Sequence, residues 1–97
     1  MTILQNFEWD ERKRDANVKK HNFDFVDAIT VFDDQDRLDR IDIRKQYTEI
    51  RYQTIGKPPH TDWVVMVIWT HRGKNKRIIS ARIAHAKERV LYNEKQN

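Results

Sequence analysis

The residues best equipped for chemistry are arginines in the last quarter of the chain. Arg77 and Arg82 bracket residues 78–81 (IISA), an apolar run of the kind that forms strands. A guanidinium matches the oxygens of a phosphate with two parallel hydrogen bonds. The segment therefore predicts a phosphate-binding site mounted on a strand.

A third arginine, Arg51, belongs to an alternating segment, residues 47–55, in which Glu49 lies on the same face. Glu49 is either a general base or the salt-bridge partner of Arg51, and an exposed ion pair is the commoner arrangement. Arg77 and Arg82 are five residues apart, so an ideal strand turns them to opposite faces unless a bulge or the strand end reorients one. Arg77 is otherwise expected to pair with an acidic group on the helix side.

An ordered series of residues links this segment to residues 7–10 (FEWD) near the start. The series consists of Lys13, Asn17, Lys20, His21, Phe25, Ala28, Val31, Phe32, Glu49, Arg51, Gly56, Glu88, Arg89 and Tyr92. In this order the residues resemble the BrnT family, small toxins of type II toxin–antitoxin modules, over about residues 7–92.

The resemblance implies a RelE-like fold and a ribonuclease that blocks translation without a cofactor. It also implies neutralisation by a cognate BrnA-type antitoxin in a hetero-oligomer, which represses its own operon by contacting operator DNA through the antitoxin.

Metal-independent RNA cleavage requires removal of the 2′-hydroxyl proton, stabilisation of the phosphorane and protonation of the leaving 5′-oxygen. Arg51, Arg77 and Arg82 are the candidates for the phosphorane, and Glu49 for the base. Lys45 is a catalytic candidate by position only. Many members of the family carry histidine there, and lysine shuttles protons near neutral pH only when its pKa is strongly depressed.

The bulk composition predicts one folded domain over residues 1–97 with a thin core, since the chain is 38% hydrophobic and 35% charged. Cysteine is absent, which excludes disulfides and thiolate metal sites. Because there is no signal-like or membrane-length apolar run, we expect no membrane contact and a cytoplasmic location.

The positive charge is concentrated at the end of the chain. Residues 71–97 hold 8 Lys/Arg and 2 Asp/Glu, net +6, whereas residues 1–70 hold 11 and 13, net −2. This asymmetry indicates either a polyanion or acidic protein as partner, or a solvated C-terminal helix. The RNA-binding candidates are Lys74, Lys76, Lys87, Arg89 and Tyr92, although Tyr92 is better explained as a helix residue packed on the sheet.

A metal site is not predicted. The histidines at positions 21, 60, 71 and 85 lack ligand spacing, and the acidic stretch 33–42 lacks a cation-loop pattern, so we expect a solvated loop or short edge strand there.

The expected fold class is α+β, with two N-terminal helices, a three- to four-stranded antiparallel sheet and a C-terminal helix. Asp10 should cap a helix over residues 11–20 that has Ala16 on its buried side. Asp24 should cap a second helix, which buries Phe25, Ala28, Ile29 and Phe32. Strands are expected at residues 47–55, 63–69 and 76–83, with an edge strand at 38–41. In the last helix, residues 85–94, Val90 and Leu91 should be buried, and His85 replaces the usual threonine cap three residues before Glu88.

Two other functions compete with a toxin. A basic adaptor would bind nucleic acid or an acidic protein without cleaving it. A DNA-binding repressor is disfavoured because the first two helices carry no basic recognition face beyond Lys19 and Lys20.

Overall fold

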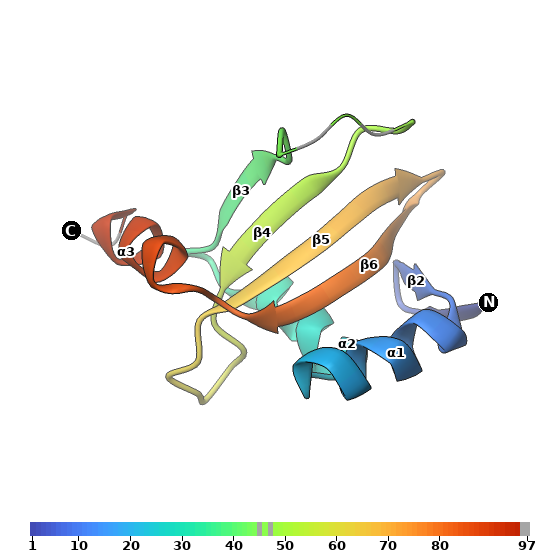
Figure 1. Cartoon of the computed structure of the whole chain (residues 1–97), viewed down its shortest axis with the longest axis horizontal. Helices are drawn as coiled ribbons and strands as arrows, with labels where there is room; N and C mark the ends of the chain where they lie inside the picture. The colour runs from blue at the N-terminus through green and yellow to red at the C-terminus, as the bar shows by residue number, and fades with distance from the viewer. Residues whose placement is uncertain (45, 47, 96–97) are drawn as a thin grey trace.

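The computed structural model describes residues 1–44, 46 and 48–95 and has one six-stranded sheet with helices on both faces (Figure 1). The elements are β1 (Thr2–Leu4), β2 (Phe7–Trp9), α1 (Glu11–His21), α2 (Phe25–Ala28), the 3₁₀ helix η1 (Ile29–Asp33), β3 (Leu38–Ile41), β4 (Tyr52–Gly56), β5 (Val65–Arg72), β6 (Asn75–Ile83) and α3 (Ala86–Lys95). The α+β class is confirmed. The strand count was too low, and the sheet is mixed because β2 runs parallel to β6.

The two N-terminal strands, β1 and β2, were not predicted. Each is three residues long, and they join through a turn in which Gln5 has φ 57°. Only Phe7 and Glu8 of β2 pair with β6, opposite Lys76 and Arg77. These strands depend on a partner almost 70 residues away, which no local pattern reveals.

The helix starts follow the capping prediction. Asp10 accepts a hydrogen bond from the Arg12 amide, and Asp24 from the Val26 amide. The inner residue of α1 is Asn17, however, and the prediction of Ala16 was wrong because Ala16 is exposed. The second predicted helix tightens into η1 after one turn, but its apolar residues still face the core.

The two faces of the sheet are covered unequally. Helices α1, α2 and η1 bury one face around Trp9, Phe25, Val31, Trp69 and Ile78. On the opposite face α3 covers only the end of the strands near β4 (Figure 1). The remainder of that face is left for a site.

Helix α3 meets the sheet through Tyr92, which packs with Ile55, Met66 and Ile68. The prediction that Val90 and Leu91 are buried was wrong, since they are 52% and 37% exposed. The rotation of a short helix is set by the sheet beneath it, and burying Tyr92 turns its two aliphatic neighbours outward.

The edge strand at residues 38–41 is confirmed as β3. The expectation of a solvated acidic stretch fails at two positions. The Asp42 side chain is fully buried and accepts from Arg44 and Gln53, while Asp34 accepts from the Lys57 amide. Both carboxylates fasten the loops around β4.

Candidate functional site

A β-bulge in β6 decides which side chains share the open face of the sheet. Ile68 pairs with Ser80 and Trp69 with Ile78, so Ile79 is the extra residue. Ile78 and Ala81 therefore both point into the core under α1 and α2. Arg77 and Arg82, opposite Thr70 and Met66, consequently lie on the same face, as the bulge alternative required.

A carboxylate joins two guanidiniums at the far end of this face. Arg51 Nε lies 3.5 Å from Glu49 Oε1, and Arg72 Nη2 lies 3.7 Å from Glu49 Oε2. The Thr70 hydroxyl also donates to the Ile50 carbonyl at 2.6 Å, which holds this segment against β5. Sequence reasoning found Glu49 and Arg51 but missed Arg72, although alternation along β5 puts it beside Thr70.

The end of β6 carries a tighter pair. Both terminal nitrogens of Arg82 donate to Glu88, at 2.7 and 2.9 Å, and the two side chains are only 15% and 14% exposed. Burial alone would raise the pKa of Glu88, but the hydrogen bonds from Arg82 and from the His85 amide hold that pKa below its ordinary value. The fork of Arg82 is thus fixed in orientation.

The same glutamate also begins α3. Glu88 Oε1 accepts from the His85 amide at 2.7 Å, which is half of a capping box. The threonine expected from the family is therefore not needed for this bond. Sequence reasoning treated Glu88 only as a capping residue and missed its link to Arg82.

Arg77 has a different environment. Within the described ranges it forms no ion pair shorter than 4 Å. The pair predicted with an acidic group on the helix side is therefore not formed within those ranges. Asp10 is the N-cap of α1, and its pKa is lowered mainly by the Arg12 amide, with the charge of Arg77 as the smallest contribution. Arg77 is half-buried at the rim of the open face.

The predicted basic surface does not form one patch. Lys76 lies on the opposite face of β6 from Arg77, with its ammonium over the rings of Phe32 and Trp69 at 5.7 and 5.2 Å. Lys74 is at the β5–β6 turn, and Lys87 and Arg89 are exposed on α3. The alternation of β6 separates Lys76 from the other cations.

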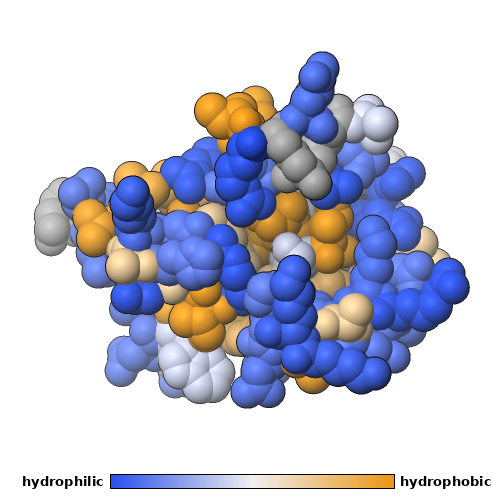
Figure 2. Space-filling model, in the orientation of Figure 1, coloured by the Kyte–Doolittle hydropathy of each residue, from blue (hydrophilic) through white to orange (hydrophobic). Residues whose placement is uncertain are grey.

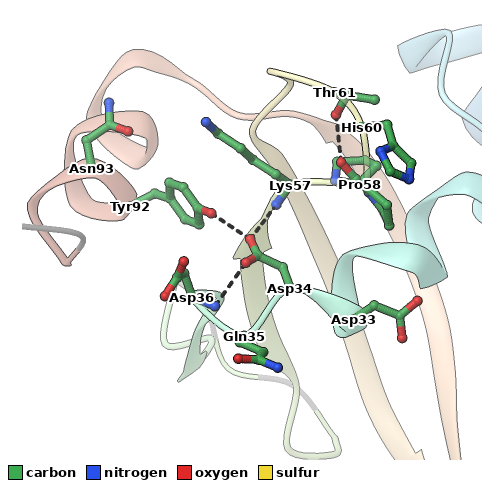
Figure 3. A pocket seen from close by; sticks show the side chains of 11 residues that line it. Asp33, Asp34, Gln35, Asp36, Lys57, Pro58, His60, Thr61, Tyr92 and Asn93 are labelled. Carbon is green, nitrogen blue, oxygen red and sulfur yellow. Dashed lines mark hydrogen bonds between the residues drawn. The ribbon is translucent and has the colours of Figure 1, made fainter.

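Tyr92 is a packing residue. It is 4% exposed, and its hydroxyl donates to Asp34 at 2.6 Å, where the Lys57 amide also points (Figure 3). Burial and the bond to Asp34 raise the pKa of Tyr92. It lines a hollow of about 520 Å³ between η1 and α3 but has no ring face available to stack on a base.

Lys45 lies outside the described residues. The segment before it is anchored by buried Asp42, whose amide donates to the Arg51 carbonyl at 2.8 Å. Gln53 bridges Asp42 to Arg40 on the same face of the sheet. In the described part of the chain no three histidine or acidic side chains gather as metal ligands.

The open face as a whole combines apolar and cationic groups. Figure 2 shows apolar side chains over the central strands, framed by hydrophilic ones. Guanidiniums at fixed positions around such a floor can hold a phosphate while bases or ribose lie on the apolar part.

Comparison with protein families identifies the group to which this arrangement belongs. The family described as "Ribonuclease toxin, BrnT, of type II toxin-antitoxin system" matches residues 9–88. The chain belongs to the BrnT family. No curated protein matches it significantly.

The BrnT match includes Glu49, Arg51, Arg77, Arg82 and Glu88, and it ends before Arg89 and Tyr92. Membership makes the chain a ribonuclease toxin, with RNA as its target and an antitoxin as its partner. No helix in the described ranges has the length and hydrophobicity needed to cross a membrane.

Proposed function

We propose that this BrnT protein cleaves RNA on the open face of its sheet by attack of the ribose 2′-hydroxyl on the adjacent phosphate, without a metal ion. The observation that supports this proposal is the bulge at Ile79, which brings Arg77 and Arg82 to one face with Arg51. Guanidiniums there would stabilise the charge that develops on the phosphorane.

The remaining roles follow from the contacts. Glu49 is the general base, because its carboxylate lies between Arg51 and Arg72 and remains 34% exposed to a substrate. Glu88 orients Arg82, and Arg82 Nη1 also donates to the Ile83 carbonyl at 3.4 Å. The Nε–H and one hydrogen on Nη2 are left for phosphate. Lys45 remains a candidate for protonating the leaving oxygen.

The partner is a BrnA-type antitoxin in the cytoplasm. We propose that it covers the open face and forms a hetero-oligomer that represses the operon through the antitoxin's own DNA-binding part. The cations involved are Lys74, Arg77, Lys87 and Arg89, without Lys76. Because charge steers such encounters, the association rate should fall as salt rises while dissociation changes little. An association rate indifferent to salt would place the interface elsewhere.

The direct test is cleavage of labelled RNA in EDTA. We expect products ending in 2′,3′-cyclic phosphate and no cleavage of RNA with 2′-deoxyribose at the cut. Binding without cleavage would support the adaptor function instead. Cleavage that requires a metal ion, or products with 5′-phosphate and 3′-hydroxyl ends, would refute the mechanism. In cells, expression without antitoxin should arrest protein synthesis.

Substitution at position 82 needs a matched design because of the ion pair. Arg82→Ala should abolish cleavage, but it also leaves the Glu88 carboxylate without its partner. The double variant Arg82→Ala with Glu88→Gln removes that charge and keeps an oxygen that accepts from the His85 amide, so it should restore stability without activity. Arg82→Lys should retain only part of the activity, since lysine lacks the bidentate fork. Wild-type cleavage by all three would remove Arg82 from the site.

A further inference from the structure

The outer edge of β6 is bordered by a helix along most of its length. Strand β2 pairs with β6 only at Lys76 and Arg77, and beyond this point α1 lies beside the strand (Figure 1). The side chain of Asn17 takes the place of a neighbouring strand by bonding both backbone groups of Ala81. A shallow groove runs between α1 and this edge.

The α1 side of the groove is basic. Lys13, Lys20 and His21 line it at helical spacing i, i+7 and i+8, opposite Ile79 and Ser80 at the bulge. Seven helical residues span about 10 Å, so the two ammonium groups lie along a track rather than at a point. Both lysines are exposed.

A second hollow continues from the first, with His21 in both. It is lined by Phe23, Trp63 and Ile83, and it measures about 400 Å³. Trp63 is 57% exposed and is supported from below by an edge contact with buried Phe23, at 6.4 Å between ring centroids. An indole held in this way offers an apolar plane to solvent.

The linings of the two hollows carry no negative charge. No acidic side chain lines either of them, whereas the hollow near Tyr92 includes three aspartates and that beside Arg14 includes Asp15 and Asp24. Burial lowers the pKa of His21, and the nearby charges of Lys20, Arg82 and His85 lower it further. Ile79 lines the groove and also packs with Met66 and Ile68 on the open face of the sheet, so the groove joins that face.

We propose that a single strand of RNA leaving the cleavage site crosses the edge of β6 and follows this groove, with phosphates on Lys13 and Lys20 and a base stacked on Trp63. Basic tracks with exposed aromatic rings are the usual means of binding single-stranded nucleic acid. The inference rests on the proposed function, since the cleavage site supplies the strand.

The binding test uses a fluorescent twelve-nucleotide RNA that is fully 2′-O-methylated and so cannot be cut. Lys13→Gln with Lys20→Gln should weaken binding at least fivefold and reduce the salt slope by about 1.4, at about 0.7 per phosphate contact. Trp63→Ala should weaken binding at least fivefold, and Trp63→Phe should restore most of it. The matched control is Lys19→Gln, because Lys19 is exposed on the other flank of α1.

A three-nucleotide cleavable RNA separates this track from the cutting centre. Its kcat should be unchanged in the groove variants, whereas KM for a twelve-nucleotide cleavable RNA should rise. Failure of the wild type to cut either RNA would overturn the proposed function, and the binding assay would still report on the groove. Groove variants that bind the methylated RNA as the Lys19 control does would overturn the inference. Groove variants that lose antitoxin binding but still bind RNA normally would also overturn the inference, and would assign the groove to the antitoxin.

Discussion

Replacing Asn17 by alanine should destabilise the protein strongly. The Asn17 side chain is 6% exposed and makes three hydrogen bonds, to the carbonyls of Phe23 and Ala81 at 2.8 Å each and from the Ala81 amide at 3.1 Å. These bonds fix the turn after α1 and the strand residue next to Arg82. Alanine removes all three and leaves the backbone groups buried.

The size of the effect follows from the number of groups left without partners. Each buried polar group that loses its partner costs about 1–3 kcal/mol. The groove beside α1 lets water reach this position, so we take the lower end and expect about 3 kcal/mol. That is a large part of the roughly 5–15 kcal/mol that stabilises a domain, and it corresponds to a fall in Tm of about 12–24 °C.

Urea unfolding of purified variants measures the effect. The midpoint should fall by about 2 M without a change in m, for m near 1.5 kcal/mol/M. Asp15→Ala, an exposed change on the same helix, is the control and should stay within about 0.5 kcal/mol of wild type. Asn17→Asp sets a carboxylate against two carbonyls, which raises its folded pKa, so this variant should gain stability as pH falls. A loss below 1 kcal/mol in Asn17→Ala would refute the reasoning.

Three further predictions concern stability. Gly56→Ala should cost about 1–3 kcal/mol in thermal melts, because the new Cβ would lie 2.8 Å from Val31 Cγ1. Gly73→Ala should cost only about 1 kcal/mol, because Gly73 has φ 56° but open space around it. Equal losses in the two variants would contradict this prediction. Because the folded pKa of Glu88 is lowered, the carboxylate stabilises the fold at pH values above its unfolded pKa, near 4.5. This stability should be lost as the pH falls below that value. Glu88→Gln should therefore make the free energy of unfolding less dependent on pH in acid. Tyr92→Phe should cost about 1 kcal/mol in urea and leave affinity for methylated RNA unchanged, and a weaker affinity would return Tyr92 to the RNA site.

Structural features that depend on residues close together in the sequence could be predicted from the sequence. The caps at Asp10 and Asp24 depend on side chains two residues from the amides they bind, and both were predicted. The strands expected at residues 63–69 and 76–83 correspond to β5 and β6, which are joined by a turn in which Gly73 takes a positive φ. Strands β1 and β2 were missed because β2 pairs with β6 through tertiary contacts, and β1 in turn pairs with β2.

The candidate site was predictable only in part for the same reason. The sequence pointed to Arg51, Arg77 and Arg82, but whether the last two share a face depended on one extra residue in β6. Nothing in residues 78–81 marks Ile79 as that residue. The ion pair from Arg82 to Glu88 depends on how α3 docks, which also decided that Tyr92 is buried instead of Val90 and Leu91.

The parallel pairing of β2 with β6 has a consequence for how the toxin is made. Strand β2 can pair with β6 only after residues 76 and 77 have been synthesised. The hydrogen bond from Asn17 to the Ala81 carbonyl likewise requires Ala81. Contacts between chain ends are slow to form because a long loop must close first. A growing chain that lacks β6 therefore lacks both the partner of β2 and the two arginines of the proposed RNA site, Arg77 and Arg82, so that site can form only after β6 has been synthesised.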